Sequence, residues 1–234
     1  GLAIESQTLF SRIDNLNWYL EAQVMPKLVA AIHASRVNVG DETTWKNLAK
    51  KPDEGEPKKK RFYLWAVHND RAIVFDVFDG RSGKIAKTFL KDLKGVLLVD
   101  GFRGYDCLAS ADLLVARDWV HGRRRFTAAE ANNPKEAAWF IAKIKLLFDI
   151  EEEAKGKALV EIQAMRDEKS RPIVAAIQTK LEELAAKTLP GSSLGKASDY
   201  MRKYWRGLTV FLDHPDVPLD SNGVERAIRG PVVG

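Results

Sequence analysis

The sequence predicts a mixed α/β sheet with a helical lead-in and an all-helical insertion. Three observations lead to this prediction. In the first half of the chain, strand-like runs alternate with short helical stretches. The next segment shows only helical periodicity. Near the end, a turn precedes the beginning of another helix. We expect a helical lead-in at 1–35 and the first part of the core at 36–132. The helical insertion is expected at 133–214, and the start of a final core helix at 215–234.

The lead-in is predicted from apolar residues that recur at helical spacing from Gln7 to His33, with a kink expected at Pro26. A short strand is expected at 36–39. The following segment, 48–60, is dense in Pro, Gly, Lys and Glu, which is typical of an exposed loop.

A hairpin is predicted from two strand-like runs, 61–67 and 72–78, which are separated by the turn-forming residues 68–70. Ser82 then precedes a helical stretch that is expected to end near Leu93.

A buried strand is predicted from Gly95 onward, because 96–99 is apolar throughout; its last residue, Asp100, is acidic. A short helix and a strand at 113–120 are expected next. Breaks at Pro172 and at 189–192 are expected to divide the insertion into three or four helices.

The composition is that of a globular protein of 234 residues, of which 45% are hydrophobic. No apolar run approaches the roughly 20 residues that span a bilayer, and the first residues do not form a signal peptide. A cytoplasmic location without membrane contact is therefore expected. The single cysteine, Cys107, excludes an internal disulfide and a multi-cysteine zinc site, and is expected to be a small buried side chain.

Positive residues cluster more than the net charge of +5 indicates. The clusters are Lys58–Arg61, then Arg123, Arg124 and Arg125, then Arg226 and Arg229. Such clusters can bind the phosphates of nucleic acid. The lysines also fit a solvated loop.

Three carboxylates far apart in the sequence are candidate metal ligands. Asp41 follows the expected strand at 36–39, Asp100 ends the buried strand, and Glu225 lies at a helix start. Two divalent ions held by carboxylates can align a nucleophile and stabilise the leaving oxygen in phosphodiester chemistry. Local pattern leaves other roles open: both aspartates could be turn formers or caps, and Glu42 rivals Asp41.

Glu225 has a further structural alternative, because Asn222 to Glu225 matches a helix capping box with Asn222 as the cap. His121, beside the three arginines, could orient a substrate phosphate or tune a metal-bound water, or it could be structural.

Several segments together resemble the DDE transposases of the bacterial insertion sequence sixty-six type. Four runs carry the resemblance, in matching order and separation: Gly40–Thr43, Leu98–Tyr105, Trp119–Phe126 and Asp220–Arg229. The last run looks like the family's Asp-Asn-Asn-x-x-Glu-Arg-x-x-Arg signature and is the most specific. Ser221 stands where the family commonly has Asn, and Asp118 where it usually has Cys in a Cys/Asp-x-x-His element.

The resemblance implies a ribonuclease-H-like core interrupted by the helical insertion. It also implies that Asp41, Asp100 and Glu225 are the catalytic triad and bind two Mg²⁺ or Mn²⁺ ions, with His121 also in the catalytic site. The five arginines at 123–125, 226 and 229 would contact DNA phosphates.

The activity that the resemblance implies is hydrolysis and strand transfer at transposon ends. The partners would be transposon-end and target DNA, bound by a homo-oligomer in the bacterial nucleoid. Recognition of specific ends is expected to lie outside this chain. Two alternatives stay open: an inactive remnant that binds nucleic acid, and a related nuclease that cuts without joining.

Overall fold

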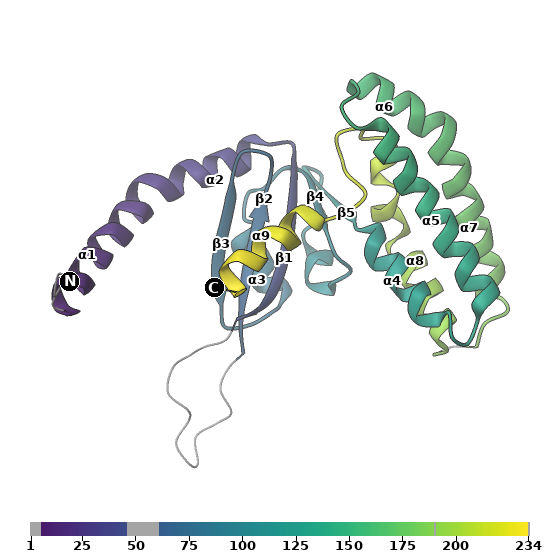
Figure 1. Cartoon of the computed structure of the whole chain (residues 1–234), viewed down its shortest axis with the longest axis horizontal. Helices are drawn as coiled ribbons and strands as arrows, with labels where there is room; N and C mark the ends of the chain where they lie inside the picture. Colours follow the sequence, from purple (N-terminus) through teal and green to yellow (C-terminus); the bar gives the residue numbers. More distant parts are fainter. Residues whose placement is uncertain (1–5, 46–60, 190, 234) are drawn as a thin grey trace, which may run out of the picture.

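The computed structural model describes residues 6–45, 61–189 and 191–233. The lead-in consists of α1 (Ser6–Tyr19) and α2 (Met25–Ala34), joined by a π-helical turn at Leu20–Val24. Pro26 lies in the first turn of α2, where its missing N–H breaks no helical hydrogen bond. The irregularity therefore precedes the proline. Figure 1 shows α1 projecting away from the sheet.

In the part of the chain that the structure describes, five strands form one mixed sheet in the order β3-β2-β1-β4-β5. The strands are β1 (Val37–Trp45), β2 (Phe62–His68), β3 (Ile73–Phe78), β4 (Gly95–Val99) and β5 (Leu113–Arg117). β2 is antiparallel to both of its neighbours, which confirms the predicted hairpin, whereas β4 is parallel to β1 and β5.

β1 is longer than predicted and contains Asp41, which was expected to follow the strand. The expected end at Val39 was wrong because Gly40 to Trp45 pair with β2, for example Asp41 with Ala66. Pairing with a neighbouring strand here overrides the low strand preference of the Gly-Asp-Glu run. Residues 41 and 42 consequently point to opposite faces of the sheet.

The predicted strand at 113–120 ends early, at Arg117, because Asp118 caps a helix. The Asp118 carboxylate accepts a hydrogen bond from the Val120 N–H at 2.5 Å, and α4 (Trp119–Ala129) follows. His121 and the three arginines therefore lie on a helix.

Short helices connect β3 to β4 and β4 to β5. Ser82 caps α3 (Gly83–Phe89), which ends before the expected Leu93. The predicted short helix is the 3₁₀ turn η2 at Arg103–Cys107. Cys107 is exposed rather than buried, because its side chain lies on the outer side of this turn, where Sγ donates to the Gly104 carbonyl.

The insertion contains four α-helices, α5 (Pro134–Ala154), α6 (Leu159–Met165), α7 (Arg171–Ala185) and α8 (Ser193–Leu208), before α9 (Asn222–Val233) returns to the sheet. The α-helix is interrupted just before Pro172 by a π-helical turn at Arg166–Ser170, which separates α6 from α7, and Pro172 lies in the first turn of α7. Figure 1 shows these helices and α4 as a bundle beside β5. No helix of the described part of the chain is long and apolar enough to cross a membrane.

Two hydrophobic clusters cover the two faces of the sheet. Val39, Val96 and Leu98 pack with residues of α8 and α9 on one face. Leu97 and Val99 pack with residues of α2 and α3 on the other. The two faces therefore carry different partners, and the face on which a carboxylate lies decides what it can meet.

A buried arginine ties the insertion to the segment that leads into α9. Arg166 is 2% exposed and forms an ion pair with Glu151 at 2.6 Å. Its guanidinium also donates to the carbonyls of Phe211, His214 and Val217. This network fixes the path along which the chain leaves the bundle toward α9.

Candidate functional site

Asp41 lies in β1, and Asp100 directly follows β4, the parallel neighbour of β1. Val37 pairs with Val96 and Val39 with Leu98. Two further residues along this register, Asp41 comes beside Asp100. Because side chains alternate along a strand, both carboxylates belong to the face covered by α8 and α9. Burial, and next the negative charge of Asp100, raise the pKa of Asp41 to about 6.

Glu42, the sequence rival of Asp41, lies on the opposite face. Its side chain is fully buried, ion-paired with Arg81 and hydrogen-bonded by the Tyr105 hydroxyl. Burial raises the pKa of Glu42 to about 7 against the opposing effects of these two partners. Glu42 is therefore engaged in the core, whereas Asp41 is not.

Arg81 links the two faces and was not singled out from the sequence. Besides its ion pair with Glu42, its guanidinium lies 3.6 Å from an Asp100 oxygen and 4.0 Å from the centroid of the Phe102 ring. The Phe102 N–H donates to the other Asp100 oxygen at 2.8 Å. These contacts fix the Asp100 carboxylate. No local pattern marks Arg81, since its partners are distant in sequence.

Glu225 lies in the first turn of α9, as both sequence interpretations required. Asn222 is the first helical residue, so the cap was predicted one position too late. Instead the Ser221 carbonyl accepts from the N–H groups of Val224 and Glu225. The Glu225 carboxylate faces α4, 3.7 Å from Arg124.

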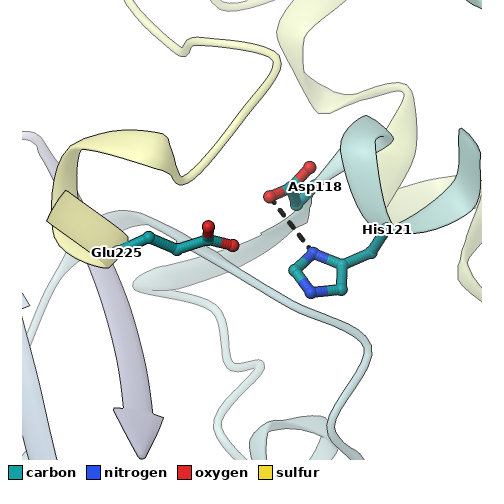
Figure 2. Close-up of side chains that lie close together, drawn as sticks. All are labelled: Asp118, His121 and Glu225. Carbon is teal, nitrogen blue, oxygen red and sulfur yellow. Dashed lines mark hydrogen bonds and ion pairs between the residues drawn. The ribbon is translucent and has the colours of Figure 1, made fainter. Parts of the chain in front are cut away.

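Within the described residues, one group of at least three acidic, histidine or cysteine side chains is compact enough to hold a metal. It contains Asp118, His121 and Glu225, whose candidate ligand atoms lie within 4.8 Å of one another. Figure 2 shows Glu225 extending from α9 toward the other two. Asp41 and Asp100 lie outside this group, although Glu225 also contributes to the raised pKa of Asp41.

Asp118 is already saturated with hydrogen bonds. Besides the Val120 N–H, it accepts from His121 Nδ1 at 3.3 Å and from the Ser221 N–H and hydroxyl at 3.1 and 2.6 Å. Burial alone would raise the pKa of Asp118, but the bonds from His121 and Ser221 hold it below its ordinary value. A carboxylate so engaged orients its neighbours, and we infer that it is not itself a metal ligand.

His121 is hydrogen-bonded to this carboxylate through Nδ1. The hydrogen bond to Asp118 raises the pKa of His121, against the opposing effect of burial. A protonated imidazole cannot ligate a metal but can donate to an anion. When it is protonated, His121 adds positive charge beside Glu225.

The predicted arginines border this acidic site on two helices. Arg123, Arg124 and Arg125 are exposed on α4, and Arg226 and Arg229 are exposed on α9. The cluster Lys58–Lys60 lies outside the described residues. The structure therefore brings two of the three basic runs to the helices that carry His121 and Glu225.

The donor set fits a hard divalent cation. Asp41, Asp100 and Glu225 offer carboxylate oxygens, which Mg²⁺ and Mn²⁺ prefer. Burial first, and then the negative charges of Asp100 and Glu225, raise the pKa of Asp41, and a bound cation would offset the contribution of these charges.

The structure is thus a mixed α/β sheet with carboxylates next to two helices that carry exposed arginines. The chain belongs to the transposase IS66 family, whose family model matches residues 1–234.

Similar proteins occur in Sinorhizobium fredii (strain NBRC 101917 / NGR234). The uncharacterized protein y4jD is 28% identical over 98% of this chain and 47% of its own length. The uncharacterized protein y4qI is 31% identical over 81% of this chain and 38% of its own length. The chain thus spans less than half the length of these relatives. No solved structure matches it.

Proposed function

We propose that this chain is the catalytic core of a DNA transposase with a ribonuclease-H-like sheet. One observation carries the proposal. Asp41 lies in β1, Asp100 directly follows the parallel neighbour β4, and the charges of Asp100 and of Glu225 in α9 both contribute to the raised pKa of Asp41. The strand order and the family membership support it.

In this proposal Asp41, Asp100 and Glu225 hold two Mg²⁺ or Mn²⁺ ions. When bound, the ions supply alignment of an oxygen nucleophile and stabilisation of the leaving oxygen. Arg81 fixes the Asp100 carboxylate, and Asp118 fixes His121 and the start of α9. His121 and the arginines offset the negative charge of the DNA phosphates.

The proposed reaction is cleavage at a transposon end, followed by attack of the freed 3′-hydroxyl on target DNA. Homo-oligomers would pair two DNA ends in the nucleoid. A related nuclease would perform only the cleavage. Linear products without joined DNA, in an assay of the full-length protein, would therefore favour the nuclease alternative.

Metal binding tests the proposal on the chain itself. Mn²⁺ is expected to raise the free energy of unfolding at pH 8 by about 2–3 kcal/mol at 100 times its dissociation constant, because only the folded chain gathers the ligands. Thermal unfolding with and without Mn²⁺ measures this gain.

The control is the exposed carboxylate variant Glu182→Gln on α7, which should keep the full gain; Glu225→Ala should lose most of it. Equal Mn²⁺ stabilisation of the original chain and Glu225→Ala would exclude Glu225 as a ligand. An inactive remnant would show no gain at all.

The arginine border makes a second prediction, about salt. When one phosphate contact is removed, binding releases about one counterion fewer. The plot of the logarithm of the DNA association constant against the logarithm of the salt concentration should therefore become less steep by roughly one. Arg123→Ala is expected to weaken binding to duplex DNA about equally for unrelated sequences. Fluorescence anisotropy across a salt series measures both effects. Arg202→Ala, an exposed arginine paired with Asp199 on α8, is the control and should leave the slope unchanged.

A further inference from the structure

Tyr200 brings a buried phenol from the insertion to the acidic site. It lies on α8 and is 8% exposed. Its ring and hydroxyl pack against Gly101, the residue after Asp100, so closely that any side chain at position 101 would overlap them. A residue from the distant helical insertion therefore lies beside a proposed metal ligand.

The Tyr200 hydroxyl is buried and has no hydrogen-bond partner among the described residues. A buried hydroxyl without a partner costs about 1–3 kcal/mol, so such groups in folded proteins usually have a role. Tyr204, one turn later, differs: its hydroxyl donates to the Gly101 carbonyl at 2.9 Å and accepts from Lys203 at 2.7 Å. The two neighbouring tyrosines thus contrast in this one property.

A cation lies directly on the Tyr200 ring. The Arg125 guanidinium carbon is 4.1 Å from the ring centroid. Stacking on the ring leaves the edge of the guanidinium, with its N–H donors, for another partner. The Arg125 guanidinium is therefore stacked on the same tyrosine whose hydroxyl lies against Gly101.

We propose that Tyr200 and Arg125 form a clamp for a phosphodiester group of DNA, with the Tyr200 hydroxyl donating to a non-bridging oxygen. The clamp deepens the proposed function and rests on it. Burial, together with the charge of Asp100, raises the pKa of Tyr200, which keeps the hydroxyl protonated and able to donate. Arg125 supplies a positive charge for the phosphodiester. The Tyr200 hydroxyl, which stays uncharged, supplies a hydrogen-bond donor close to the carboxylates, where a negatively charged tyrosinate would be repelled.

Through this clamp, the helical insertion would take part in DNA binding. α8 carries Tyr200, and α4, which packs on α8, carries Arg125. The packing of α4 on α8 holds the two residues together. The insertion would thus contribute directly to the site as well as to stability.

The test compares Tyr200→Phe with Tyr204→Phe, which remove the same atom from the same helix. Binding to a fluorescein-labelled 20-base-pair duplex is measured by fluorescence anisotropy. Ca²⁺ is present, because its positive charge offsets the negative charge of the carboxylates. Tyr200→Phe should weaken binding about 3- to 10-fold, as expected for one hydrogen bond to a charged group, without lowering the melting temperature. Tyr204→Phe should lower the melting temperature and leave binding within about 2-fold, because its hydroxyl has internal partners.

Two results would overturn the clamp: wild-type affinity in Tyr200→Phe, or no binding of the duplex by the original chain. A drop in the melting temperature of Tyr200→Phe equal to that of Tyr204→Phe would also overturn it, by revealing an internal partner. The Mn²⁺ measurement judges the proposed function separately. A chain that Mn²⁺ stabilises, but whose Tyr200→Phe variant binds DNA normally, would retain the function and lose the clamp.

Discussion

Asp41→Asn is expected to stabilise the metal-free chain and to abolish its proposed activity. The pKa of Asp41 is raised to about 6, so the ionised carboxylate opposes folding. This penalty is absent below the ordinary pKa of 3.8, grows between 3.8 and about 6, and is complete above it. At pH 8 the substitution should therefore raise the free energy of unfolding by about 1–2 kcal/mol, after discounting the shift for partial solvent exposure.

The same substitution should remove the response to metal. Without the Asp41 oxygen, Mn²⁺ should no longer stabilise the chain, and strand transfer by the full-length protein should fall about 10³-fold or more. Urea unfolding at pH 4 and pH 8, with and without Mn²⁺, measures the first two effects. Stabilisation at pH 8 that vanishes at pH 4 would be the signature of a carboxylate held at a cost for its function.

Glu42→Gln is the matched control, because it changes the next residue of the same strand on the opposite face. It should keep its Mn²⁺ response, since Glu42 is engaged by Arg81 and Tyr105. Loss of the response in Glu42→Gln, with retention in Asp41→Asn, would reverse the assignment of the first ligand.

The contrast between residues 41 and 42 shows what the sequence could predict. The motif favoured Asp41, but the strand was expected to end at Val39, and without the strand there was no alternation to separate the two carboxylates. The register of β1 against β2 and β4 supplies that separation. It depends on contacts between segments that are distant in the sequence, and local preferences do not contain it.

The strands and helices with strong local signals were predicted well. The hairpin of β2 and β3, the buried strand β4 and the helices of the insertion agree with their apolar periodicity. Arg81 and Tyr200 were missed for a common reason. Each acts through partners far away in sequence, so neither position carries a local pattern.

Asp118 was the other uncertain position, and Asp118→Ala is expected to have the largest effect on stability of any change at the site. The residue is fully buried and joins α4 to the start of α9: it caps α4, orients His121 on the same helix and binds Ser221 just before α9. The substitution removes a cap and leaves the Ser221 N–H without its acceptor. We expect a loss of about 2–4 kcal/mol in the free energy of unfolding.

Ser192→Ala provides the control for Asp118→Ala, because Ser192 caps α8 and accepts only from the Gly195 N–H. This substitution should cost about 1 kcal/mol, the usual value for a cap. The additional loss in the free energy of unfolding of Asp118→Ala measures the hydrogen bonds to His121 and Ser221. A double-mutant cycle of Asp118→Ala with Ser221→Ala should give a coupling of about 1–2 kcal/mol, and additive effects would contradict the network.

The pH dependence of the Asp118→Ala penalty follows from the two shifted groups. Asp118 has a lowered pKa, so its contribution is complete above the ordinary value of 3.8 and is lost as the pH falls through its folded pKa. His121 has a raised pKa, so its contribution is complete below the ordinary value of 6.5 and is lost as the pH rises through its folded pKa. The penalty should therefore be largest between about pH 4 and 6.5. A penalty that stays constant from pH 4 to pH 9 would show that His121 is not held as a cation, and its positive charge would then be absent from the site beside Glu225.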